Sequence, residues 1–122
     1  MPGENPEPLA SWDEVVAFAL TLPDAEASGS YGRPAVKVRG KAFVFFGRAK
    51  GSFGVSTPLD EKELLMLTEP DTFWETPHYR GWPAVLIRYG SPSRERIEMV
   101  IERAWWDRAS KAQRARRGGE RP

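Results

Sequence analysis

The sequence contains no cysteine and a single histidine, His78, among its 122 residues. The lack of cysteine excludes disulfide bridges, thiolate metal sites, iron–sulfur clusters and cysteine nucleophiles, and it is compatible with a reducing compartment. One histidine disfavours both a histidine-dominated metal centre and a Ser-His-Asp triad with a spare histidine. We therefore expect no metal and no cofactor.

Long apolar runs are also missing, because no stretch of about 18 apolar residues is present to cross a membrane. The first residues are not followed by the apolar region of a signal peptide. The expected protein is soluble and cytoplasmic and has no membrane partner. Its length suits one domain, which we divide into a disordered leader at 1–10, a single domain at 11–110 and a basic flexible tail at 111–122.

The net charge is close to zero, with 18 Lys and Arg against 17 Asp and Glu, but the charges are arranged in blocks. Residues 1–26 contain six acids and no base, and residues 27–59 contain six bases and no acid. Residues 60–75 return to six acids against one lysine, and from residue 76 eleven bases accompany five acids. Such blocks either form a local basic face that suits an anionic partner or interleave in the fold and cancel.

Motifs and periodicity predict an α+β domain with the element order α-β-β-β-α-β-β-α. Ser11 to Glu14 is typical of a capping box that begins a helix, and Pro92 after Ser91 favours the start of the last helix. Strands are expected at 35–39, 42–46, 53–56, 73–75 and 84–89, with a loop over 24–34. Hairpin-length connections favour antiparallel pairing, so we expect two layers, with helices packed on an antiparallel sheet of about five strands.

The first hairpin is expected to turn at Gly40-Lys41. This register places Val36, Val38, Phe43 and Phe45 on the core face and leaves the opposite face to Lys37, Arg39, Ala42, Val44 and Phe46. A face that mixes bases with apolar and aromatic groups can hold phosphates and cover nucleic-acid bases. The alternative is a solvated sheet face that another element or a dimer partner partly covers.

Two loops, 30–34 and 76–83, each combine an aromatic residue, an arginine and a glycine before a proline that introduces a strand. If the loops meet at one end of the sheet, they form an anion pocket whose candidate residues are Tyr31, Arg33, His78, Tyr79, Arg80 and Trp82. The alternative for His78 is a structural role. Acid–base catalysis by His78 is a further alternative, but Glu75 is the one carboxylate near it in sequence. We therefore expect no catalytic residues.

The sequence resembles the MmcQ/YjbR family, whose members are named as DNA-binding proteins, over residues 12–108. The segments that carry the resemblance are S-Y-G-R-P at 30–34, V-K-V-R-G-K at 36–41, T-P-H-Y-R-G-W-P at 76–83, the strand at 84–88 and Ala104-Trp105 in the last helix. The resemblance implies a compact α+β fold with helices packed on an antiparallel sheet. It also implies DNA binding, and it brings no catalytic residues.

The expected function is therefore DNA binding through phosphates at a local basic face. The candidate contacts are Arg33, Lys37, Arg39, Lys41, Arg80, Lys111 and Arg114, with Trp82 or Tyr79 against bases. The alternative is a module that binds an acidic segment of a protein partner or an anionic small molecule through the two aromatic and arginine-containing loops.

Overall fold

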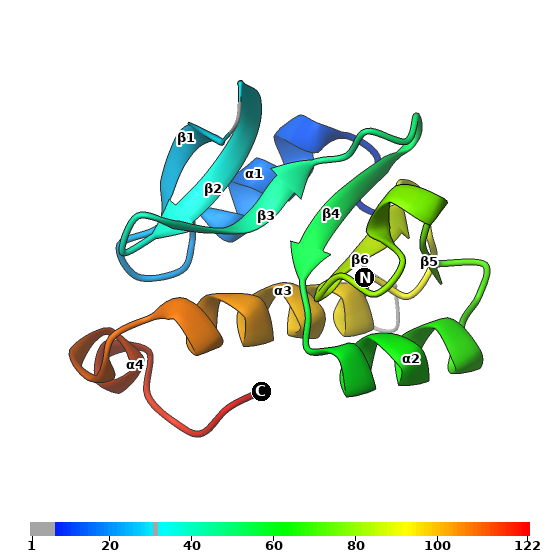
Figure 1. Cartoon of the computed structure of the whole chain (residues 1–122). Helices are drawn as coiled ribbons and strands as arrows, with labels where there is room; N and C mark the ends of the chain where they lie inside the picture. Colours follow the sequence, from blue (N-terminus) through cyan, green and yellow to red (C-terminus); the bar gives the residue numbers. More distant parts are fainter. Residues whose placement is uncertain (1–6, 31) are drawn as a thin grey trace.

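The computed structural model describes residues 7–30 and 32–122, which contain one antiparallel sheet with the strand order β1-β2-β3-β4-β6-β5 (Figure 1). The strands are β1 (Glu26–Ser30), β2 (Arg33–Val38), β3 (Lys41–Phe46), β4 (Ser52–Ser56), β5 (Phe73–Trp74) and β6 (Ala84–Arg88). The helices are α1 (Trp12–Ala19), α2 (Leu59–Thr68), α3 (Arg94–Arg108), α4 (Lys111–Arg117) and the short 3-10 helix η1 (Pro77–Tyr79). The prediction of an α+β fold with an antiparallel sheet is confirmed, with six strands in place of about five.

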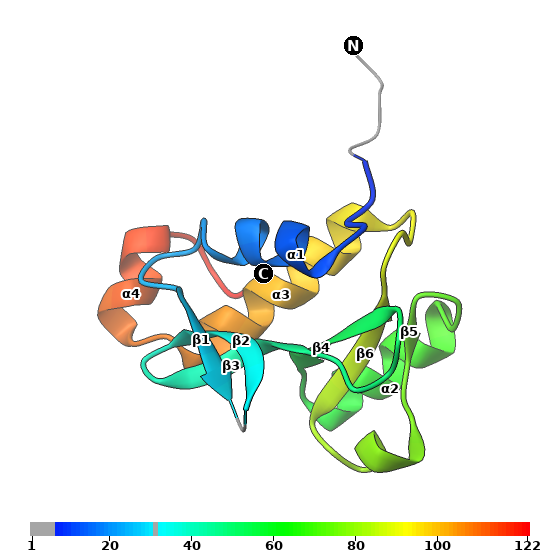
Figure 2. The same cartoon turned by 90° about the horizontal axis from the view of Figure 1, so that it is seen from above.

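Helices α1 and α3 cover one face of the sheet, which we call the inner face, and η1 lies on the opposite, outer side (Figure 2). Helix α2 lies beside α3 and is joined to it by the ion pairs Arg96–Glu69 at 2.8 Å and Arg103–Glu61 at 3.2 Å. None of the described helices is long and apolar enough to span a bilayer.

The core lies between the inner face and the helices, and Trp105 of α3 is fully buried in it. The Trp105 indole N–H donates to the Pro23 carbonyl at 2.9 Å, which satisfies its one polar group. Leu9 also joins this core with 2% exposure, and its carbonyl accepts a hydrogen bond from the Gly90 N–H at 2.8 Å. Leu9 falls in the segment for which we expected a disordered leader; residues 1–6 of that segment lie outside the described residues.

Strand β1 occupies part of the segment 24–34, for which the sequence predicted a loop. Its sequence, Glu-Ala-Ser-Gly-Ser, has no β-branched or aromatic residue, so its intrinsic strand propensity is low. It forms at the edge of the sheet because β2 provides an antiparallel partner along its whole length, from Glu26 opposite Lys37 to Ser30 opposite Arg33. Pairing with a neighbour has therefore overridden local propensity.

The turn between β2 and β3 lies at Arg39-Gly40, one residue before the predicted position. Both residues have positive φ, 54° and 73°, as a type I′ turn requires, and glycine takes its usual second place. With an irregularity between Val36 and Lys37, Val36 pairs with Val44 and Ala35 with Phe45.

The predicted faces of β3 are wrong from Val44 onward, because the irregularity between Val36 and Lys37 gives β3 one extra residue and reverses every side chain that follows. Phe43 itself is fully buried in the core, as predicted. Val44 is fully buried on the inner face, whereas Phe45 is half-buried on the outer face. Phe46 shares the inner side with Val44 but is 41% exposed, with its ring edge-on to Trp12 at 5.8 Å. The predicted mixed face of bases and apolar groups is thus divided between the two sides of the sheet and the Arg39-Gly40 turn.

The segment 111–122, for which we expected a flexible tail, contains helix α4. The helix begins with a reciprocal capping box, in which Ser110 Oγ accepts from the Gln113 N–H at 3.1 Å and Gln113 Oε1 accepts from the Ser110 N–H at 2.8 Å. Gln113 and Arg116 also donate to the carboxylate of Asp24, at 3.1 and 2.8 Å. These two hydrogen bonds lower the pKa of Asp24 below its ordinary value. They fasten α4 to the loop after α1.

Replacing Ser110 with alanine should loosen α4 and leave the sheet intact, because one half of the capping box is lost. An N-cap serine contributes about 1 kcal/mol to helix stability, so the Arg114 and Gly118 amides, which donate within α4, should exchange hydrogen about fivefold faster. Hydrogen exchange measured by mass spectrometry tests this expectation. Ser28→Ala, at an exposed position of β1, is the control, and equal exchange of α4 in both variants would contradict the role of the cap.

Candidate nucleic-acid interface

The outer face of the sheet carries a row of side chains aligned across four strands. Phe45 lies opposite Gly54, Gly54 opposite Leu86, and Leu86 opposite Trp74. Gly54 has no side chain, and the Phe45 ring fills the space above it, where a Cβ atom would overlap the ring. Ala49 of the β3–β4 turn packs against the same group of residues. The row therefore forms an apolar floor on the side of the sheet away from α1 and α3.

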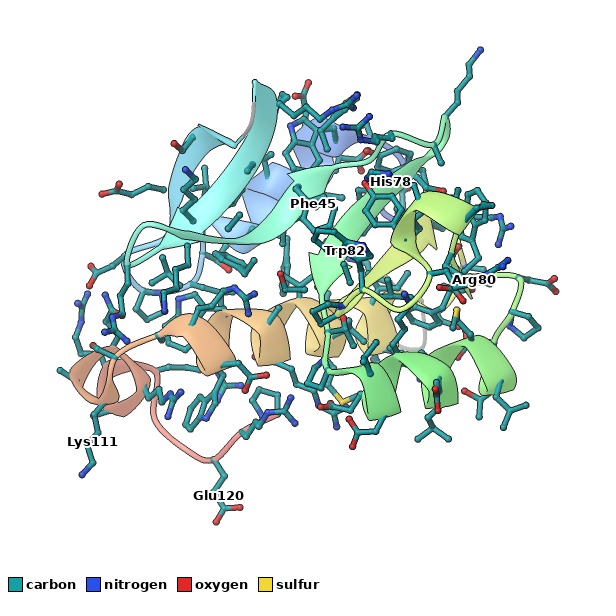
Figure 3. All side chains as sticks on the ribbon, viewed as in Figure 1. Phe45, His78, Arg80, Trp82, Lys111 and Glu120 are labelled. Atoms are coloured by element: carbon teal, nitrogen blue, oxygen red, sulfur yellow. The ribbon has the colours of Figure 1, made fainter. Side chains whose placement is uncertain are left out.

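Aromatic rings rise from this floor toward solvent, and we call Phe45, Tyr79, His78 and Trp82 the aromatic cluster (Figure 3). The Tyr79 ring stacks on Phe45 with centroids 6.1 Å apart, and the His78 ring meets Tyr79 edge-on at 4.9 Å. Trp82 lies nearly parallel to His78, with an interplanar angle of 12° and centroids 6.5 Å apart. Exposure increases outward, from 8% for Tyr79 to 62% for Trp82.

A buried lysine holds the loop that carries these rings. Lys62 of α2 is 2% exposed, and its ammonium donates to the carbonyls of Tyr79 at 2.7 Å and Trp82 at 2.9 Å. The same nitrogen forms an ion pair with Glu75 Oε2 at 3.0 Å. That oxygen is buried and has no hydrogen-bond partner among the described residues, so the ion pair is what neutralises it. We call this arrangement the Lys62 clamp.

Several bases adjoin residues of the aromatic cluster or of its floor. Arg80 is exposed directly after η1, and Arg48 and Lys50 are exposed on either side of Ala49, which contacts the floor. The Arg88 guanidinium lies 4.4 Å from the centre of the Trp74 ring, a cation–π geometry, and donates to the Pro70 carbonyl at 3.1 Å. The outer side thus combines exposed rings with exposed cations.

The basic residues of the helices and those of the hairpins differ in whether they form ion pairs. Ion pairs of 2.5–3.2 Å neutralise six arginines of α3, α4 and the residues after α4, namely Arg94, Arg96, Arg103, Arg116, Arg117 and Arg121. Within the described residues, no ion pair involves the six bases from β2 to the β3–β4 turn, which we call the hairpin bases: Arg33, Lys37, Arg39, Lys41, Arg48 and Lys50. The block of positive charge seen in the sequence is therefore not cancelled by ion pairs within the part of the chain described.

Two carboxylates do lie beside one end of the hairpin. Glu26 is opposite Lys37 across β1 and β2, and a surface hollow of about 430 Å³ is lined by residues of β1, β2 and α4 together with Asp24, Arg39 and Gly40. Because Gln113 of α4 lines the same hollow, Lys37 and Arg39 share this end of the molecule with α4. Two bases, Lys37 and Arg39, and two acids, Asp24 and Glu26, therefore line this hollow together.

The two α4 residues among the predicted contacts differ in their surroundings. Lys111 is exposed and projects away from the body of the protein (Figure 3). Arg114 instead turns back on α3, where it donates to the Trp106 carbonyl at 2.7 Å and lies 5.5 Å from the centre of the Trp106 ring. Arg114 is thus engaged in holding α4.

The structure brings together some of the residues predicted for the anion pocket but not all of those it describes. His78, Tyr79 and Trp82 are in mutual contact, but Tyr79 is buried against Phe45 as a packing residue. Arg33 lies two residues before Ala35, which is opposite Phe45 on the outer face. Among the described residues no hydrogen bond or ion pair joins Arg33 to the η1 loop, and Tyr31 lies outside the described residues.

His78 lacks the surroundings of a general acid or base. It is exposed, and no carboxylate among the described residues forms an ion pair with it. A catalytic histidine usually needs such a partner to fix its orientation. Within residues 7–30 and 32–122, no group of three His, Asp or Glu side chains is placed to ligate a metal.

Sequence reasoning missed Lys62, Phe45, Arg48 and Lys50 as parts of this interface. Lys62 is three residues before the buried Leu65 on α2, so helical spacing could have placed it on the covered side. The side occupied by Phe45 depends on the irregularity between Val36 and Lys37, where β3 has one extra residue. Arg48 and Lys50 are recognisable as bases in a turn, but no local pattern indicates that Ala49 between them packs near Tyr79.

Comparison with known proteins supports the family resemblance. A family model described as YjbR matches residues 20–106. An uncharacterized protein of Mycobacterium bovis and two uncharacterized proteins of Mycobacterium tuberculosis strains are each 38% identical over 50 residues, which is 41% of this chain and 39% of the relative. The match thus spans about two-fifths of these relatives, and no solved structure matches the chain significantly. Because the family model covers most of the described sheet and helices, the chain belongs to the YjbR family.

Proposed function

We propose that this protein binds DNA by contacting phosphates with its hairpin bases and Arg80, and that it carries out no catalysis. The observation that carries the proposal is the pairing difference: the hairpin bases are without ion-pair partners among the described residues, whereas most arginines of α3 and α4 are neutralised. A free cation can contact phosphate without breaking an internal ion pair. The DNA-binding label implied by the family resemblance agrees with this proposal, and we propose a cytoplasmic location.

The contacts would extend along the hairpin. Strands β2 and β3 have six residues each, and six residues of a strand span about 20 Å. Bases occur at the Arg39-Gly40 turn, along β2 and in the β3–β4 turn, so one DNA backbone could meet three or four of them. Because the net charge is only +1, the attraction should be local and sensitive to salt.

Fluorescence anisotropy with labelled DNA at about 50–200 mM salt tests the proposal. If three or four phosphates are neutralised, log K should fall with log salt at a slope of about −3 to −4. Lys37→Gln combined with Lys41→Gln should lessen that slope by about 2. The control, Arg94→Gln with Arg117→Gln, removes the same charge from residues paired with Glu98 and Glu102. Absence of binding at low salt, or equal effects of the two variants, would contradict the proposal.

The alternative of an anionic small-molecule pocket in the two loops has less support. It required Tyr79 as a pocket wall, but the Tyr79 ring is packed on Phe45 and is 8% exposed. His78 has no carboxylate partner among the described residues, which also disfavours acid–base catalysis. Thermal-shift measurements with inorganic phosphate and nucleotides check this alternative. A pocket in the two loops would raise the melting temperature of the wild-type protein with these anions but not that of Arg80→Ala, and we expect no such difference.

A further inference from the structure

We infer that the aromatic cluster is a stacking platform for unpaired bases, so that the favoured DNA is single-stranded. The inference rests on the proposed function and specifies the form of DNA that the same surface takes. It concerns the outer end of the cluster, where His78 and Trp82 are exposed and lie within 12° of parallel.

The exposure of Trp82 is the first argument. At 62% exposure it is one of the most exposed large apolar side chains among the described residues, although a tryptophan in a folded domain is usually largely buried. Its neighbour His78 offers a second flat ring, and histidine is among the side chains on which bases stack. Arg80 lies between these two residues in the chain, and Arg48 and Lys50 flank Ala49, which packs against the floor. All three bases are exposed, as a platform that also tracks a phosphate backbone requires.

The rigidity of the loop is the second argument. Lys62 binds the carbonyls of both Tyr79 and Trp82, and the Thr57 N–H donates to the Pro83 carbonyl at 2.9 Å. The Tyr79 ring is anchored on Phe45 beneath. An exposed ring on a fixed backbone loses little conformational freedom when a base stacks on it, which favours binding.

The two longest described helices provide the third argument, because neither α2 nor α3 is suited to reading a DNA major groove. Such a helix presents free polar and basic side chains to base edges. The arginines Arg94, Arg96 and Arg103 of α3 are held in ion pairs. The exposed side of α2 carries Asp60 and Glu63, which would repel phosphates. Exposed rings beside a sheet are instead the arrangement by which single strands are bound, because the faces of unpaired bases are accessible.

The test compares an oligothymidine of about 12 nucleotides, within the usual range of single-strand site sizes, with an abasic oligonucleotide of the same length. The two carry the same phosphates, but the abasic strand has nothing to stack. We expect the protein to bind oligothymidine more tightly than the abasic strand, as measured by anisotropy. Trp82→Ala should weaken oligothymidine binding about 5- to 100-fold and leave abasic binding unchanged, while Trp82→Phe should retain most of the affinity.

Leu67→Ala is the control, since Leu67 is also an exposed large apolar residue, 79% exposed, but lies on α2 away from the cluster. Equal affinity for the two strands, or an equal loss for both strands in Trp82→Ala, would overturn the stacking platform and leave phosphate binding standing. Failure of the protein to bind either strand or duplex at low salt would instead overturn the proposed function. A duplex bound more tightly than oligothymidine at equal phosphate number would also count against the inference.

Discussion

Replacing Lys62 with methionine should lower the free energy of unfolding by about 3–5 kcal/mol, the usual effect of removing one partner of a buried ion pair. Methionine fills similar space but cannot donate, so the carbonyls of Tyr79 and Trp82 lose a shared donor. The Glu75 carboxylate loses the cation 3.0 Å from its buried oxygen. Urea denaturation of the wild-type and variant proteins measures the difference.

A second substitution separates the parts of this effect. Glu75→Gln removes the charge that Lys62→Met leaves unpaired, so the double variant should be more stable than Lys62→Met alone by about 1–3 kcal/mol. The loss of stability that remains in the double variant measures the contribution of the hydrogen bonds from Lys62 to the two carbonyls. Lys50→Met at an exposed position should change stability by less than about 0.5 kcal/mol. A loss below about 1 kcal/mol for Lys62→Met would mean that the clamp does not hold the loop.

The clamp also explains why the site was only partly predictable from the sequence. The segment 76–83 was identified from its residue types, and the structure places its His78, Tyr79 and Trp82 in contact. The lysine that holds the segment is 17 residues from Tyr79 in the chain, within a run of acids that is typical of a solvated helix. A long-range contact of this kind has no local pattern, because it depends on how α2 packs beside β6.

Local signals were reliable where one residue decides the geometry. The N-cap half of the capping box predicted at Ser11 is present, with Ser11 Oγ accepting from the Glu14 N–H at 3.3 Å. The Glu14 carboxylate accepts from the Ser11 hydroxyl at 3.2 Å in place of the backbone N–H. The apolar residues of α3 that recur at helical spacing, which include Ile97, Ile101 and Trp105, are buried, as such spacing predicts. In both cases the interaction lies within one or two helical turns, so tertiary structure had little to add.

The hairpin shows how one extra residue in a strand reverses the faces of the residues that follow it. The turn at Arg39-Gly40 lies one residue before the predicted position and holds arginine at a positive φ of 54°, which is uncommon for a residue with a Cβ atom. Moving a two-residue turn by one position shifts the pairing by two residues and keeps the faces, so the irregularity between Val36 and Lys37 is what moves Phe45 from the expected core to the outer face. The aromatic cluster was therefore invisible from the sequence, although three of its four members had been singled out.

Replacing Gly54 with alanine should destabilise the protein by about 2–3 kcal/mol, toward the upper end of the range for overpacking. The added methyl group would occupy the space that the Phe45 ring fills on the outer face. The Phe45 ring must then move, which also disrupts its stack on the Tyr79 ring, whose centroid lies 6.1 Å from its own. Thermal or urea denaturation measures the loss. Gly29→Ala is the matched control, because a methyl group there would be 3.6 Å from the Arg33 carbonyl, an ordinary contact, and should change stability by less than about 0.5 kcal/mol.

A double-mutant cycle with Phe45→Ala tests whether this ring is the cause. Phe45→Ala alone should destabilise the protein, because it uncovers the apolar floor. In that background Gly54→Ala should cost less than about 0.5 kcal/mol, since its methyl group enters space that the ring has vacated, which gives a coupling free energy of about 2 kcal/mol. An equal cost of Gly54→Ala with and without the ring would show that the two positions do not touch. The Tyr79 ring would then lack its support, and the exposed His78 and Trp82 rings would have no rigid base on which to receive a nucleotide.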